Sequence, residues 1–79
     1  SVTALQIAPQ SEFLEHHHTL EATYYVLSGK GGVILNGEKA AIEEGDLVYV
    51  PAYTRHGFFN ESDTAIELLS VVAGPTMLE

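Results

Sequence analysis

The sequence has no cysteine, and only three lysine and arginine residues stand against eleven aspartate and glutamate residues, for a formal net charge of −8. Without cysteine there is no disulfide framework and no thiolate metal cluster. The scarcity of cations argues against nucleic-acid and membrane-surface partners, because both require a positive footprint. No apolar run approaches the roughly 20 residues of a membrane span. The first residues do not show the charged-then-apolar pattern of a signal segment, which a mature form would have lost. We therefore expect a soluble, cytoplasmic protein.

What the sequence does contain is enough apolar material for one small core. The chain has 79 residues, of which 46% are hydrophobic, too many for a disordered chain. We expect a single domain over residues 1–79. A core of this size seldom gives more than about 3–5 kcal/mol of net stability. With no disulfide available, we expect a bound metal and a homodimer interface to add to it, and we expect the dimer to pair through the N-terminal or C-terminal strand.

Short β-strands account for most of the hydrophobic pattern. Strands are predicted at 2–7, 23–27, 33–35, 38–42, 47–50, 55–59 and 65–72. Asn36-Gly37 predicts a tight hairpin between two of them, because both turn positions need positive φ. The run at 65–72 also fits helical spacing, but its β-branched content favours a strand. Seven or eight such strands predict an all-β sandwich or barrel.

The first candidate site is a histidine-rich segment, Glu15-His16-His17-His18-Thr19-Leu20-Glu21, that leads into the strand at 23–27. Residues two apart on a strand share a face, so His16 and His18 face one way and His17 the other. Two imidazoles on one face suit a divalent transition metal such as Fe, Mn, Zn, Ni or Cu. The alternative is a solvated polar strand end.

The second candidate site follows the apolar strand at 47–50. Pro51 ends that strand, and the next strand carries His56 and Phe58 on one face. A single histidine among aromatic residues also fits a buried core position. Its combination with His16 and His18 favours a metal ligand.

Both segments match motifs of a known family. Residues Gly45, Pro51, His56 and Asn60 match the second cupin motif, G-x5-P-x-G-x2-H-x3-N, in which Tyr53 replaces a glycine. His16, His18 and Gly29 match the first motif, G-x5-H-x-H-x3-4-E-x6-G, in which Gln10 replaces the opening glycine. The chain therefore resembles the cupins over more than half its length.

The resemblance implies a double-stranded β-helix, or jelly-roll barrel, that holds a metal through His16, His18, His56 and one glutamate. The glutamate position falls on Ala22, and Glu21 lies one residue early. By strand parity Glu21 reaches the metal only if a bulge intervenes. Without it the site has three histidines. A shifted ligand set of Glu15, His17 and Glu21 is a third possibility.

The same parity predicts the pocket around the metal. Tyr24, Val26, Tyr49 and Phe58 are expected to line it. An open metal site of this kind predicts an enzyme that acts on a small organic molecule, of the dioxygenase, isomerase, decarboxylase or lyase type. A non-catalytic binding or storage module is the alternative, and a regulatory fragment of a longer chain is a third reading.

Overall fold

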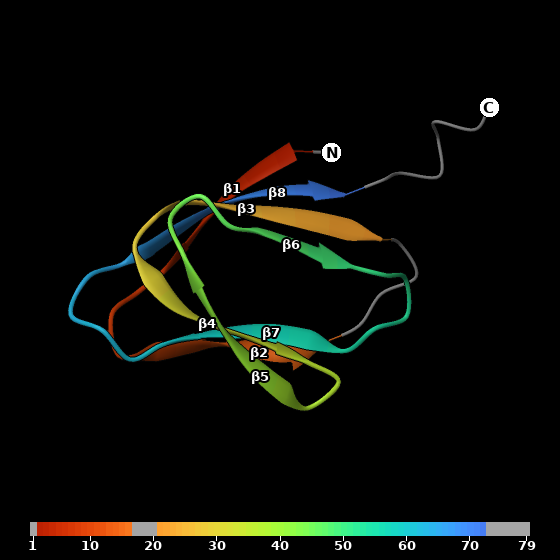
Figure 1. The fold of residues 1–79 in the computed structure, drawn as a ribbon, viewed down its shortest axis with the longest axis horizontal. Helices are drawn as coiled ribbons and strands as arrows, with labels where there is room; N and C mark the ends of the chain where they lie inside the picture. Colours follow the sequence, from red (N-terminus) through yellow and green to blue (C-terminus); the bar gives the residue numbers. More distant parts are fainter. Residues whose placement is uncertain (1, 17–20, 73–79) are drawn as a thin grey trace.

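The computed structural model describes residues 2–16 and 21–72, and for residues 14–16 the backbone alone. These residues form two four-stranded antiparallel sheets that face each other (Figure 1). One sheet has the strand order β1-β8-β3-β6 and the other β2-β7-β4-β5. The strands are β1 (Val2–Ile7), β2 (Ser11–His16), β3 (Ala22–Ser28), β4 (Lys30–Leu35), β5 (Glu38–Glu43), β6 (Leu47–Val50), β7 (His56–Asn60) and β8 (Ile66–Val72). The all-β prediction is confirmed, and none of the described residues forms a helix that could cross a membrane.

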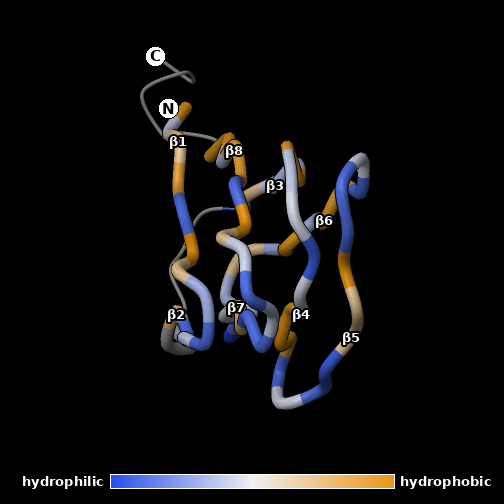
Figure 2. The backbone as a smooth tube through the Cα atoms, turned by 90° about the vertical axis from the view of Figure 1, so that its left-hand side faces the viewer, coloured by the Kyte–Doolittle hydropathy of each residue, from blue (hydrophilic) through white to orange (hydrophobic). Residues whose placement is uncertain are grey.

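Alternation along the strands places the core between the two sheets. In β3, Ala22, Tyr24 and Val26 are buried, whereas Tyr25 and Leu27 on the opposite face are exposed. Figure 2 shows the same exchange of hydrophobic and hydrophilic positions along the tube, with β1 and β5 at opposite sides of the molecule. Because successive side chains of a strand point to opposite faces, every second residue of β3 packs against the other sheet.

Two local predictions from the sequence are confirmed. Asn36 and Gly37, at φ of 50° and 86°, form the tight turn between β4 and β5. The run at 65–72 is the strand β8, which pairs with both β1 and β3. These pairings place it inside a sheet, so the helical alternative for this segment is wrong.

The strand β2 is the element that the sequence analysis did not place. It pairs with β7 so that Phe13 is opposite Phe58, but the register then shifts and His16 is opposite His56. In an unbroken ladder Glu15 would occupy that position. The extra residue is a β-bulge, which lets two residues of one strand oppose a single residue of the other.

Both positions where this chain departs from the motif glycines have left-handed backbone. Gln10 has φ of 56° and Tyr53 has φ of 66°. Glycine adopts this region at no steric cost, whereas other residues are strained there. Two positions at which the motifs have glycine therefore adopt left-handed backbone here with other residues.

Candidate metal centre

The imidazole of His56 is fully buried at the start of β7, with no exposed surface. Its Nδ1 lies 3.0 Å from the carbonyl oxygen of Thr54, and its Nε2 lies 3.0 Å from the hydroxyl of Tyr24. A carbonyl oxygen can only accept a hydrogen bond, so Nδ1 carries the proton. In the neutral ring, which burial favours, Nε2 then presents its lone pair to the barrel interior.

Tyr24 approaches His56 from the opposite sheet. Its side chain is 3% exposed, and its ring packs edge-on against Phe58 with centroids 4.9 Å apart. Burial raises the pKa of the Tyr24 hydroxyl, and a side-chain hydrogen bond with Ser70 lowers it. The hydroxyl is therefore protonated at neutral pH and donates its hydrogen to Nε2 of His56.

The structure describes the predicted histidines unequally. The Cα of His16 is the register partner of His56 across β2 and β7. His17 and His18 lie outside the described residues. Within residues 2–16 and 21–72, without the side chains of 14–16, no group of three or more potential ligands is found. The ligand set of His16, His18 and His56 stays a prediction.

Glu21 and Tyr49 lie together on the outer face of their sheet. The Tyr49 hydroxyl donates to the Glu21 carboxylate at 3.2 Å, and its side chain is 55% exposed. Desolvation, together with the charge and the hydrogen bond of Glu21, raises the pKa of Tyr49. Tyr49 was expected in the pocket lining, and this expectation is wrong because Val48 and Val50 occupy the inward positions of β6.

The start of β3 explains the position of Glu21. Its ladders with β6 and β8 run without a register shift from Ala22 through Tyr25. In the part of the chain that follows Glu21, where the structure describes the register, no bulge therefore lies between Ala22 and Tyr25. Ala22, which the motif would have as glutamate, takes the buried position instead.

The remaining predicted lining residues face the interior. Tyr24, Val26 and Phe58 are at most 3% exposed and belong to one apolar cluster between the sheets. Their contact with a ligand stays a prediction.

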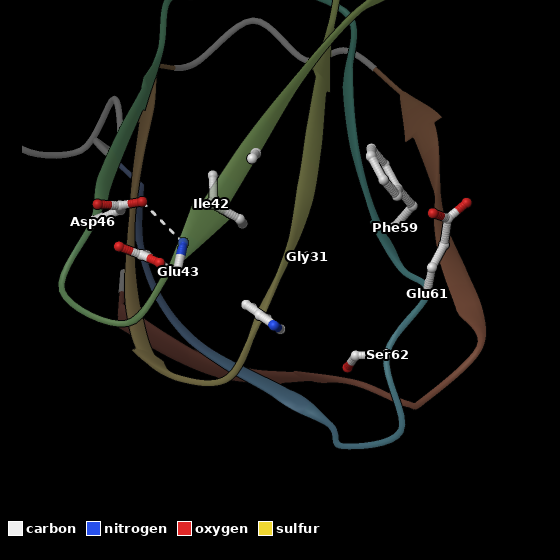
Figure 3. Close-up of a pocket in the computed structure, with 9 residues that line it drawn as sticks. Gly31, Ile42, Glu43, Asp46, Phe59, Glu61 and Ser62 are labelled. Atoms are coloured by element: carbon white, nitrogen blue, oxygen red, sulfur yellow. Dashed lines mark hydrogen bonds between the residues drawn. The ribbon is translucent and has the colours of Figure 1, made fainter.

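A separate cavity of about 630 Å³ is shown in Figure 3. Its lining includes Phe59, near the end of β7, whereas His56 is the first residue of that strand and is not part of the lining. The lining combines a lysine, three carboxylates and an apolar patch: Lys30, Gly31, Ala41, Ile42, Glu43, Asp46, Phe59, Glu61 and Ser62. The Asp46 carboxylate already accepts the Glu43 backbone N–H at 2.9 Å. None of these residues was among the candidates predicted from the sequence.

Two groups of the site were not predicted. The Thr54 carbonyl that fixes the His56 ring is a backbone atom, so its residue type carries no signal. Ser70 is buried in β8 opposite Tyr24. A small polar residue at an inward position of an apolar strand is the one signal that could have identified it.

His56, the predicted histidine ligand whose side chain the structure describes, fits a transition metal. A metal-bound histidine characteristically donates its other ring N–H to a carbonyl or carboxylate, which fixes the tautomer and the ring orientation. His56 makes this bond to Thr54 and turns its unprotonated nitrogen inward. His16, the second histidine of the predicted ligand set, is the register partner of His56 across β2 and β7.

Comparisons with known proteins agree with this architecture. The chain is 36% identical to an uncharacterized protein of Methanocaldococcus jannaschii, over 71% of this chain and 45% of that protein. It is 34% identical to an acireductone dioxygenase of Bacillus cytotoxicus, over 76% of this chain and 40% of the relative. It thus spans less than half the length of these curated relatives.

Solved structures share the fold. A predicted oxalate decarboxylase from Thermotoga maritima superimposes with a TM-score of 0.84 at 28% identity, over 90% of this chain and 63% of that one. The sequence profile of the cupin domain matches residues 4–72. This match covers nearly the whole chain and both histidine motifs, and the barrel expected from the resemblance is confirmed: the chain belongs to the cupin family.

Proposed function

We propose that the chain binds one divalent transition metal through His16, His18 and His56 and is the metal-binding part of an enzyme that acts on a small organic molecule. The observation that carries this proposal is the state of His56. Its ring is buried, its tautomer is fixed by the Thr54 carbonyl, and Nε2 meets the Tyr24 hydroxyl from the opposite sheet in the barrel interior. That preparation suits a ligand, since a buried imidazole needs no particular tautomer merely to fill space.

Each group of the site has a definite task in this proposal. Thr54 holds the His56 ring in place through Nδ1. Val26, Val50 and Phe58 have no exposed surface and make the interior between the two sheets apolar. When bound, the metal supplies Lewis-acid chemistry, or redox chemistry if it is iron, manganese, nickel or copper.

The names of the relatives support a reaction on a small molecule. An acireductone dioxygenase and a predicted oxalate decarboxylase are both similar to this chain. We accordingly place dioxygenase and decarboxylase chemistry ahead of the isomerase and lyase types. A homodimer and a small-molecule ligand are part of the same proposal.

Elemental analysis of the purified protein tests the metal site. We expect about one transition-metal ion per chain in the wild type, because one set of ligands holds one ion. H16A, H18A and H56A are expected to lose it, since each removes one of three donors. Circular dichroism of every variant checks that the barrel is still folded.

Two matched controls come from the same segment. H17A removes a neighbouring imidazole that strand parity places on the other face, and E21Q removes the carboxylate that accepts from Tyr49. Both are expected to keep the metal. A folded wild type that takes up no transition metal but binds a small ligand would instead identify a non-catalytic binding module.

A further inference from the structure

The hydrogen bond between Tyr24 and His56 occupies the nitrogen that the proposed metal requires. The Tyr24 hydroxyl lies 3.0 Å from Nε2, and Nδ1 is already committed to Thr54. An imidazole nitrogen has one lone pair, so Nε2 cannot accept from Tyr24 and coordinate a metal at the same time. We propose that Tyr24 is a positioning residue that holds His56 ready and competes with the metal for Nε2. This inference rests on the proposed function.

The structure holds Tyr24 firmly in this role. Its ring is fixed edge-on against Phe58, with an interplanar angle of 71°, and it also stacks at a tilt on His56 with centroids 5.8 Å apart. Ser70, its register partner on β8, hydrogen bonds to the hydroxyl. Four buried or partly buried groups thus form one continuous series: Ser70, Tyr24, His56 and the Thr54 carbonyl.

Competition between Tyr24 and the metal for Nε2 of His56 lowers the metal affinity and affects which substrates are favoured. Metal binding breaks a buried hydrogen bond, which is worth about 0.5–1.5 kcal/mol, so the affinity is lower than the histidines alone would give. The released hydroxyl keeps Ser70 as a donor to it and has its own proton to donate. A substrate oxygen that accepts this proton would restore the lost bond. Tyr24 therefore favours substrates with an oxygen acceptor close to the metal.

Titration of the metal-free protein with Co²⁺, followed by its visible absorption, measures the competition. Y24F keeps the ring and removes the hydroxyl. Because the metal then does not have to break the Tyr24–His56 hydrogen bond, we expect Y24F to bind Co²⁺ about 2- to 10-fold more tightly than the wild type. Y49F is the matched control, since it also removes a hydrogen-bonded tyrosine hydroxyl, 3.2 Å from Glu21. Its affinity is expected to be unchanged.

A second variant covers the loss of a partner for Ser70. In Y24F the Ser70 hydroxyl loses the Tyr24 hydroxyl as its partner. The double variant Y24F/S70A removes both hydroxyls, so that no such group remains, and it is expected to show the same tighter binding of Co²⁺. In the metal-free wild type, ¹⁵N NMR of His56 is expected to report protonated Nδ1 and unprotonated Nε2. A purely structural tyrosine would stabilise the fold without changing Co²⁺ affinity.

The outcomes separate this inference from the proposed function. If the wild type binds Co²⁺ and both folded variants bind it equally or more weakly, the competition is refuted and the metal site stands. If the wild type binds no Co²⁺, the metal site itself is refuted, and the inference with it.

Discussion

The two residues that replace motif glycines show how one backbone angle can be maintained by different means. Tyr53, at φ of 66°, is 71% exposed, so its side chain offers little packing in return for the strain. Gln10, at φ of 56°, donates from its side-chain amide to the carbonyls of Glu61 and Ser62, at 3.0 and 2.9 Å. The strain of the left-handed backbone is thus compensated by side-chain hydrogen bonds at Gln10, whereas the Tyr53 side chain offers little in return.

Tyr53 is therefore a site where glycine is expected to stabilise the protein. Left-handed backbone costs a non-glycine residue about 1–2 kcal/mol, and glycine gives part of this back through its greater freedom in the unfolded chain. We expect Y53G to raise the free energy of unfolding by about 0.5–1 kcal/mol in urea denaturation. Q10G serves as control and is expected to give no net gain, because it also removes two hydrogen bonds. Equal gains in both variants would contradict this explanation.

Asn60, the last residue of the second motif, has a structural role in this chain. Its side chain is 1% exposed, and its amide nitrogen donates to the carbonyls of Ile7, Ala8 and Thr64 at 2.8–3.2 Å. Its amide oxygen accepts from the backbone N–H and the hydroxyl of Ser62. One side chain therefore joins the end of β1 to the loop between β7 and β8.

Loss of this side chain is expected to be expensive. N60A leaves several buried or half-buried groups without partners, and we expect it to lower the free energy of unfolding by about 2–4 kcal/mol. S62A, which removes only one hydroxyl from the same network, is expected to cost about 1 kcal/mol. Chemical denaturation of both variants measures the difference. A similar cost for the two would show that Asn60 does not organise the loop.

At the scale of the strands, alternation and turn chemistry predicted most of the fold. The strands at 2–7 and 47–50 have the predicted bounds, and the other predicted strands shift by at most three residues at either end. The hairpin at Asn36-Gly37 follows from two residues that tolerate positive φ. These features could be predicted because each depends on residues close together in the chain.

β2 could not be placed in the same way. Its sequence, Ser-Glu-Phe-Leu-Glu-His, has neither regular alternation nor β-branched residues, and its bulge breaks what pattern there is. Its register with β7 depends on partners that are 40 to 49 residues away in the chain. The prediction that His16 and His56 belong to one site came from the motif, and the bulge is the physical device that pairs them.

Tyr49 shows the limit of alternation in β6. All four residues from Leu47 to Val50 are apolar, so hydrophobicity does not indicate which face is inward. The structure places the two valines inward and Leu47 and Tyr49 outward. The Tyr49 ring therefore lies on the outer face of the sheet and not in the pocket where the sequence analysis predicted it.

At the scale of the whole molecule, the outer face of the β1-β8-β3-β6 sheet is unusually apolar. Its register rows join Val2, Val71, Thr23 and Tyr49, and next to them Ala4, Leu69, Tyr25 and Leu47. Among these, the side chains of Val2 and Leu47 are 66% and 68% exposed. Contiguous apolar surface of this kind marks an interaction site more often than a solvated face.

This face favours a homodimer by a different route from the one the sequence predicted. The prediction was pairing through the N-terminal or C-terminal strand; β8 lies between β1 and β3 and has no free edge, whereas β1 is an edge strand, so pairing through β1 stays a prediction. We expect two chains to pack their apolar faces together, with the edge strand β1 beside the contact. Size-exclusion chromatography with light scattering is then expected to give about twice the 8.5 kDa mass of the chain.

Charge substitutions distinguish the face from other surfaces. L47E places a carboxylate within the apolar rows, where dimer formation would bury it without a partner, and is expected to give the monomer. A40E adds the same charge at an exposed position of β5, in the other sheet, and is expected to leave the dimer intact. Because the net charge is equal in the two variants, a general electrostatic repulsion would dissociate both. A dimer that persists in L47E would move the interface away from this sheet, and a monomeric wild type at tens of micromolar would refute it.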